Sequence, residues 1–278
     1  TAAMDGYDYR CVVDNSACNA ATSTAATLTV QTPPSISSQP SSSTDCEGDN
    51  VAFSISASGT GITYQWQEDQ GSGYSNLSDG GNYANTNSAT LNISSITTGM
   101  SGYTYRCLVS GTCTPNATSN DATLTVNGQP TVTSNPSSTT VCVNGDPTFT
   151  VGASGDALTY QWQVDEGSGY SNLSNAGVYS NVDAATMTIT DATAAMDGYS
   201  YRCVVDNTTC SEDISSGATL SVEVAPSVTS NPSSTTVCVD GDPTFTVAAS
   251  GDGLTYQWQE NTGGGFSDLS NGGVYSNV

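Results

Sequence analysis

A fixed interval of 96 residues runs through this 278-residue chain. The tryptophans Trp66, Trp162 and Trp258 follow it, as do two sets of cysteines: Cys46, Cys142 and Cys238, and Cys11, Cys107 and Cys203. Self-similarity at one period means that the chain folds as an array of similar units. Each unit has about the length of one small domain.

Some copies of the repeated unit are nearly identical. Residues 133–151 recur at 229–247 with one change, from Asn144 to Asp240. Such closeness indicates recent duplication of a module that is meant to be repeated.

The clearest repeated motif is the run Asp-Gly-Tyr-Ser-Tyr-Arg-Cys at 197–203, with near copies at 5–11 and 101–107. Side chains alternate between the two faces of a β-strand, so Tyr199, Tyr201 and Cys203 share one face, opposite Ser200 and Arg202. The pattern therefore predicts a strand with one buried face.

Alternation and turn residues predict further strands throughout the chain. In the second repeat, strands are expected from about residue 131 and at 139–143, 148–153, 158–163, 186–190 and 218–222, with short strands and loops between 165 and 181. The first repeat matches at 52–57, 62–67, 90–93 and 122–126, and the N-terminal part at 7–13 and 26–30. We expect Phe149, Val151, Trp162, Met187 and Ile189 to point inward.

The motifs Cys-x-x-Gly-Asp, Tyr-Gln-Trp-Gln, Asp-Gly-Tyr-x-Tyr-Arg-Cys and Ala-Thr-Leu-x-Val together extend over the repeats. The array resembles the tandem bacterial immunoglobulin-like domains of very large secreted surface adhesins and filaments. This resemblance implies an all-β fold: tandem immunoglobulin-like β-sandwich domains in a linear array. It makes Trp66, Trp162 and Trp258 core residues. It makes Tyr9, Tyr105 and Tyr201 tyrosine-corner residues, whose hydroxyl bonds back to the main chain.

The repeat places four parts along the chain. Residues 1–31 are the C-terminal part of one immunoglobulin-like domain, 33–126 and 130–222 are two further domains, and 226–278 are the N-terminal part of another. The linkers, such as 127–129, have only a few residues. Linkers this short hold neighbouring domains end to end and limit bending.

The resemblance also shows a departure. In immunoglobulin domains a disulfide joins the cysteine after the corner tyrosine to a second strand. That second position is Ile55, Val151 or Val247 here, so the usual bond cannot form.

A third cysteine per repeat offers another pairing, at Cys18, Cys113 and Cys210. A two-residue turn at 206–207 would place Cys203 opposite Cys210, so we expect this bond, and likewise Cys11–Cys18 and Cys107–Cys113. Connectivity does not follow from sequence alone. Cys46, Cys142 and Cys238 are then buried inert thiols or cross-links between domains. In the cross-link alternative Cys46 bonds Cys210, which requires their Cα atoms to lie within about 7 Å.

Composition excludes several functions. The formal charge is −23, from 26 acidic residues and three arginines, without lysine or histidine. Such a chain should repel nucleic acid and anionic membranes, and no apolar run of about 18 residues is present for membrane insertion. Ser-His-Asp and Cys-His catalysis are impossible without histidine. The carboxylates are scattered over Gly- and Ser-rich loops, so we expect no enzymatic activity.

Few other sites emerge. Arg10, Arg106 and Arg202 occupy one motif position and should pair across strands with glutamine or glutamate side chains, such as Gln163 and Glu166. A repeated docking point for a neighbouring chain is the alternative. No cofactor is expected. Asp/Asn-rich turns such as 240–242 are candidate calcium ligands, although no dedicated calcium loop is present.

We therefore expect a structural segment of a long extracellular filament or adhesin stalk, secreted to a bacterial cell surface. Its partners would be neighbouring repeats or lateral copies. The alternative is a binding module whose loops recognise glycans or a partner protein. By repeat alignment Thr1 matches Thr193 and Val278 matches Val182, which indicates a piece of a longer repetitive chain. Head-to-tail polymerisation is disfavoured, because the joined domain would lack residues equivalent to 183–192.

Overall fold

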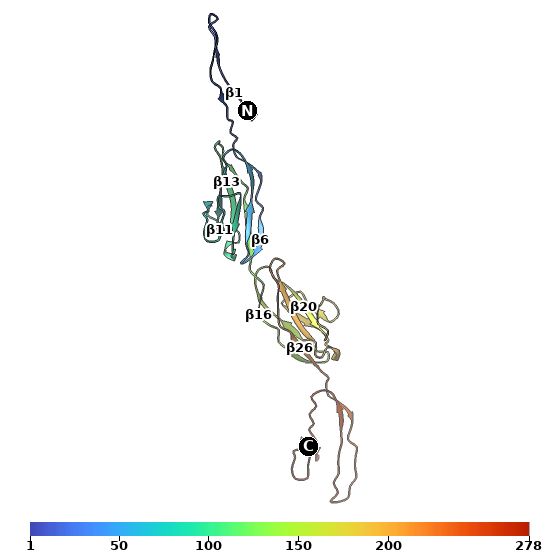
Figure 1. The fold of residues 1–278 in the computed structure, drawn as a ribbon. Coiled ribbons are helices and arrows are strands. Elements are labelled where there is room, and N and C mark those ends of the chain that lie inside the picture. The colour runs from blue at the N-terminus through green and yellow to red at the C-terminus, as the bar shows by residue number, and fades with distance from the viewer. Residues whose placement is uncertain (278) are drawn as a thin grey trace. The chain divides into compact units, whose positions relative to one another are not determined.

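The computed structural model describes residues 1–277, which form β-strands, three short 3-10 helices and loops (Figure 1). Those residues contain no α-helix, which confirms the all-β prediction. No helix among them is long and apolar enough to cross a membrane.

The chain divides into two compact units. Unit 1 comprises Thr1–Thr131 together with two loops from later in the sequence, Ser154–Leu158 and Asp206–Glu212. Unit 2 contains the rest of the described chain.

In unit 1, residues 35–127 form a β-sandwich. Its strands are β5 (Ser35–Ser38), β6 (Ser43–Cys46), β7 (Val51–Ser54), β8 (Ser56–Ser58), β9 (Thr63–Asp69), β10 (Ser75–Asn76), β11 (Tyr83–Ala84), β12 (Thr90–Ile93), β13 (Thr104–Ser110), β14 (Ala117–Thr118) and β15 (Ala122–Asn127), with helix η2 at Thr98–Met100. One sheet has the order β10-β9-β13-β15-β6, with β14 beside β13. The others are β11-β12-β7 and β5-β8. β6 runs parallel to β15, whereas the other pairs are antiparallel.

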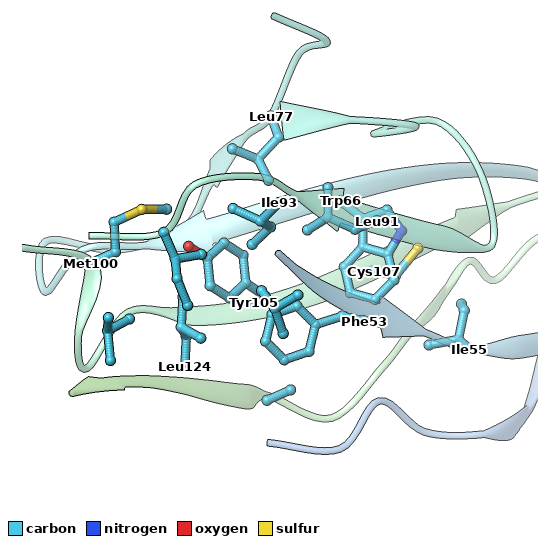
Figure 2. Packing of buried hydrophobic residues seen from close by; sticks show 14 of the residues in the cluster. Phe53, Ile55, Trp66, Leu77, Leu91, Ile93, Met100, Tyr105, Cys107 and Leu124 are labelled. Atoms are coloured by element: carbon cyan, nitrogen blue, oxygen red, sulfur yellow. The ribbon is translucent and has the colours of Figure 1, made fainter. Parts of the chain in front are cut away.

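The core of this sandwich is aromatic and aliphatic (Figure 2). Trp66 is fully buried, and its indole Nε1 donates to the Ser88 carbonyl at 2.9 Å. Phe53 from β7 stacks on Tyr105 from β13 with ring centroids 5.1 Å apart. Burial of such side chains is the dominant favourable term in folding.

Unit 2 repeats this arrangement. Its strands are β16 (Thr131–Ser134), β17 (Thr139–Cys142), β18 (Thr148–Thr150), β19 (Gly152–Ser154), β20 (Thr159–Asp165), β21 (Tyr170–Asn172), β22 (Tyr179–Ser180), β23 (Thr186–Ile189), β24 (Ser200–Asp206), β25 (Asp213–Ile214) and β26 (Ala218–Glu223), with helix η3 at Ala194–Met196. The sheets are β17-β26-β24-β20-β21 with β25 beside β24, β18-β23-β22, and β16-β19. Phe149, Val151, Trp162, Met187 and Ile189 are buried as predicted.

In the two remaining parts, the described strands form two-stranded pairs. Residues 1–31 contain η1 (Ala2–Met4), the pair β1 (Asp8–Tyr9) and β4 (Ala26–Thr27), and the pair β2 (Val12–Val13) and β3 (Ala21–Thr22). Residues 226–277 contain β27 (Ser227–Ser230) with β28 (Ala248–Ser250), and β29 (Gln259–Asn261) with β30 (Phe266–Asp268). Tyr9 is 47% exposed and Trp258 is partly exposed, unlike their equivalents in the sandwiches.

One predicted strand is divided in two. The strand expected at 148–153 is β18 and β19, which pair with different strands, β23 and β16. The first repeat does the same with β7 and β8. A strand that changes partners contributes to two hydrogen-bonded ladders, and alternation alone does not reveal the change.

Candidate functional site

A disulfide bond joins Cys46 to Cys210 within unit 1, with Cα atoms 5.4 Å apart. Cys46 is the last residue of β6 and lies in register with Asn127, the last residue of β15. The parallel pairing of β6 with β15 therefore brings the cysteine to the start of the linker. The two cysteines are 164 residues apart in sequence, on either side of that linker.

The loop that carries Cys210 is shaped by two side chains. Asp206 Oδ1 accepts the backbone N–H of Asn207 at 2.7 Å and of Thr208 at 3.1 Å. Asn207 Oδ1 accepts the N–H groups of Thr209 at 3.2 Å and of Cys210 at 2.8 Å. Such short side-chain bonds to the following backbone fix a turn. They hold the backbone at Cys210 in place independently of the bond to Cys46.

The same loop is anchored to the linker. Asn207, which is 3% exposed, donates from Nδ2 to the Gly128 carbonyl at 3.1 Å. Asn127 donates from Nδ2 to Thr209 Oγ1 at 3.2 Å, and Asp156 Oδ2 accepts the Gly128 N–H at 2.7 Å. A Cβ atom on Gly128 would lie 3.1 Å from that carboxylate oxygen, so the linker backbone and the Asp156 side chain pack closely here.

The disulfide corrects one prediction and supports its alternative. The expected Cys203–Cys210 bond is wrong, because the connection after β24 is longer than two residues. Val204 pairs with Ile214 and Val205 with Asp213 across it.

Cys203 consequently faces Ser215 instead of Cys210. Its N–H donates to Ser215 Oγ at 2.9 Å, and its carbonyl accepts the Ser215 N–H at 2.9 Å. The cross-link of Cys46 with Cys210 is the alternative that the structure supports.

The other two predicted bonds are also wrong. Cys107 faces Ser119, whose Oγ accepts the Cys107 N–H at 2.8 Å, and Cys11 faces Ser23 in the same way at 3.0 Å. The free cysteines are Cys11, Cys18, Cys107, Cys113, Cys142, Cys203 and Cys238. Cys142 and Cys238, expected as buried thiols or cross-links, are exposed and unbonded.

The cysteines on the central strands are inert thiols in the core. Cys107 and Cys203 are fully buried, and burial raises the pKa of each thiol to about 11. A thiol of this kind is a poor nucleophile at neutral pH, because the thiolate is the reactive form.

The buried tyrosines make a different hydrogen bond from the one that the resemblance implies. The Tyr105 hydroxyl lies 3.5 Å from the Tyr83 hydroxyl, and that of Tyr201 lies 3.4 Å from Tyr179. Desolvation raises the pKa of both buried hydroxyls. In the first repeat Tyr83 donates to Glu68, a carboxylate that is 6% exposed.

Two of the three arginines, Arg106 and Arg202, form the predicted cross-strand pairs. Arg202 Nε donates to Gln163 Oε1 at 2.8 Å, and Arg106 Nε donates to Gln67 Oε1 at 2.9 Å. Each guanidinium also lies over a tyrosine ring, as that of Arg106 does over Tyr74 at 3.6 Å from the centroid. This cation–π contact adds to the pairing and was not predicted.

Within residues 1–277, no group of three or more His, Cys, Asp or Glu side chains is placed to hold a metal ion. The candidate calcium turn at 240–242 supplies two carboxylates, Asp240 and Asp242.

The fold and the cross-link together define tandem immunoglobulin-like domains, in which a disulfide connects residues on either side of a short linker. A model of the family described as immunoglobulin domain matches residues 33–110. No curated protein matches the sequence.

Solved structures with tandem domains are similar to this chain. A three-domain structure of titin domains I67–I69 has a TM-score of 0.63 at 19% identity and covers 88% of this chain and 83% of its own. A second structure of the same titin I-band fragment has a TM-score of 0.62 at 18% identity, with coverage of 87% and 82%. Sidekick-1 immunoglobulin domains 1–5 have a TM-score of 0.56 at 21% identity, over 90% of this chain and 54% of that one. These TM-scores show a shared fold, and at identities below 25% the likeness extends to the fold alone.

Proposed function

We propose that this chain is a structural segment that carries tension in a long extracellular filament or adhesin stalk, built of repeated immunoglobulin-like domains and displayed on a bacterial cell surface. Its partners are neighbouring repeats, in the same chain or in lateral copies. The Cys46–Cys210 disulfide supports an extracellular location, because such bonds persist in oxidising environments.

The observation that carries the proposal is the position of the disulfide. A force applied to the two ends of the chain passes from Cys46 directly to Cys210, so the 164-residue span between these positions bears little of it. That span includes the linker and most strands of both sandwiches. Unfolding under load therefore releases little chain length, which is a useful property in a stalk.

Single-molecule pulling on the full chain, held at its two ends, tests this function. The oxidised chain should stop lengthening well before the Cys46→Ser variant. The difference should be 164 residues of contour, roughly 540–590 Å at about 3.3–3.6 Å per residue.

The Cys142→Ser variant is the matched control, because Cys142 is exposed and unbonded, and it should behave as the unmodified chain. Equal lengthening of the oxidised chain and the Cys46→Ser variant would contradict the proposed role of the disulfide in carrying tension.

The alternative function is recognition of glycans or a partner protein by the loops. Selective binding loops usually differ between repeats, but residues 70–78 and 166–174 differ only at Gln70 and Glu166. Each of these loops is also closed on itself, because Asp69 and Asp165 accept backbone N–H groups from within it. A glycan array and a cell-binding assay on the full chain should give no selective signal.

A further inference from the structure

We propose that Cys142 and Cys113 are halves of further disulfides of the Cys46–Cys210 kind, each completed by a cysteine of an adjacent repeat. Cys142 bonds the loop cysteine of the repeat that follows, and Cys113 bonds the strand-end cysteine of the repeat that precedes. The inference rests on the repeated filament proposed above, and its test is separate from the pulling experiment.

Cys142 is placed as Cys46 is. It ends β17, which runs parallel to β26, and it lies in register with Glu223, the last residue of β26. Cys46 ends β6 and lies in register with the last residue of β15. The thiol of Cys142 is nevertheless exposed and unbonded. The loop cysteine that the repeat would place opposite Cys142 falls 96 residues after Cys210, past the last residue of the 278-residue sequence.

Cys113 shows the complementary half. Its Sγ lies 3.9 Å from Gln31 Oε1, and Gln31 is the repeat equivalent of Asn127. In the bonded loop, Cys210 Sγ lies 3.7 Å from the Asn127 carbonyl oxygen. Both loop cysteines therefore lie against the same position at the end of the preceding repeat. Of these two positions, Gln31 and Asn127, it is Asn127 that has a strand-end cysteine, Cys46, in register beside it.

A hydrogen bond from a linker N–H to a side-chain oxygen recurs at the equivalent position of three linkers. Gly128 N–H donates to Asp156 Oδ2 at 2.7 Å within unit 1, and Val224 N–H donates to Asp252 Oδ2 at 2.7 Å within unit 2. At the first linker, Thr32 N–H donates to Thr60 Oγ1 at 3.0 Å. Since these pairs are repeat equivalents, each linker forms the turn that receives a loop cysteine.

The reaction is the oxidation of two thiols. An external disulfide such as oxidised glutathione accepts two electrons and two protons and leaves as two molecules of reduced glutathione. One S–S bond forms between the half-cystines while the S–S bond of the oxidant breaks. Cys107 and Cys203 take no part, because both are fully buried.

The test extends the full chain by a copy of residues 183–222 after Val278. This copy follows in register because Val278 is equivalent to Val182, and it supplies the next loop cysteine. After oxidation in glutathione buffer, free thiols are alkylated and the digest is mapped by mass spectrometry. We expect Cys142 to be bonded to the added loop cysteine in most molecules. In the unextended chain Cys142 should be alkylated.

The native bond is the internal control, since Cys46–Cys210 should form in both chains. Cys142→Ser in the extended chain should leave the added loop cysteine alkylated. An extended chain that forms Cys46–Cys210 yet leaves Cys142 alkylated overturns the proposal.

A mirror extension tests Cys113 independently of the C-terminal one. Placing a copy of residues 130–192 before Thr1, which is equivalent to Thr193, supplies a strand-end cysteine. We expect that cysteine to bond Cys113 and leave Cys107 reduced. Bonding to Cys107, or none beside a formed Cys46–Cys210 bond, overturns the proposal.

The unextended chain at high concentration shows whether the partner comes from a second copy. A dimer bonded through Cys142 and Cys18 supports the proposal with a second copy as the source, because Cys18 is a loop cysteine. If the unextended chain stays monomeric and the extended chain forms the intrachain bond, the proposal is supported with a partner cysteine from the same continuous chain. A dimer bonded through Cys142 and Cys142 overturns the pairing rule.

Discussion

Asp165 shows how one side chain closes a glycine-rich loop. Its Oδ1 accepts the N–H of Gly167 and of Gly169, both at 2.8 Å, and both glycines have positive φ. Asp69 closes the loop of the first repeat in the same way. In the third copy the position is Asn261, whose Oδ1 accepts the same two bonds. The loop therefore needs an acceptor at this position, whereas the charge adds a dependence on pH.

We predict that this charge makes the sandwiches sensitive to acid. Backbone N–H donation from Gly169 and Gly167 lowers the pKa of Asp165 below its ordinary 3.8. The stability that the charged Asp165 adds is fully present above about pH 3.8, the ordinary pKa of the group. It is lost as the pH falls through the lowered pKa of the folded state. The variant with Asp69→Asn and Asp165→Asn keeps the acceptor oxygen without the charge, so it should melt somewhat below the unmodified chain at neutral pH and lose less stability between about pH 4 and pH 2.

Thermal unfolding followed by circular dichroism over this range provides the measurement. Parallel melting curves for the variant and the unmodified chain at every pH would contradict the prediction.

A second residue-scale prediction concerns the core thiols. With a pKa of about 11, the Cys203 thiol is ionised in only about 0.1% of molecules at pH 8, and it is also shielded from solvent. Iodoacetamide should modify the exposed Cys142 within minutes and leave Cys203 unmodified until denaturant is added. Mass spectrometry of the digest measures both. Modification of Cys203 as fast as Cys142 would show that the strand opens freely.

At the scale of elements, period-two alternation predicted the strands well, because one face of each is buried and the other is wet. Met187 and Ile189 on β23 are both buried, as the pattern required. Alternation does not predict where the loops between strands place their side chains. The Asp206-Asn207 pair looks like a two-residue turn, but Asn207 instead shapes a longer loop that contacts Gly128.

The cross-link was thus predictable only as an alternative. Its geometry depends on β6 pairing parallel with β15 and on a loop 164 residues later in the chain. Contacts at this separation depend on tertiary packing, which local sequence does not encode. The signal that was available was the third cysteine in each repeat, which has no partner on its own strand.

We predict that strand β12 carries much of the stability of the first sandwich. Leu91 is fully buried and pairs in register with Phe53 on β7, whereas the neighbouring Asn92 is exposed. Leu91→Ala should lower the free energy of unfolding by about 2–5 kcal/mol, since it leaves a cavity. Asn92→Ala should change it by less than about 0.5 kcal/mol.

Denaturant unfolding followed by tryptophan fluorescence measures both variants against the unmodified chain. Only the transition that belongs to the first sandwich should move in Leu91→Ala. Equal effects of the two substitutions would contradict the burial argument.

For the whole molecule, the dominant property is a charge of −23 with three arginines to offset it. Like charges repel in the compact state, and dissolved salt screens that repulsion. The two arginines within the sandwiches each contact a tyrosine ring and a glutamine, so they offset carboxylates only at a distance. A chain of this composition is therefore stabilised by whatever screens its carboxylates.

We predict that the melting temperature rises as sodium chloride increases from about 0.01 M to about 0.5 M, over which the Debye length falls from about 30 Å to about 4 Å. Calcium chloride at matched ionic strength separates general screening from a specific site such as the 240–242 turn. If calcium acts as a screening ion, it should raise the melting temperature about as much as magnesium chloride does. A larger rise with calcium, abolished by Asp240→Asn together with Asp242→Asn, would instead assign a site to that turn. A melting temperature that falls with added sodium chloride would show that attraction between charges outweighs repulsion, and would contradict the prediction.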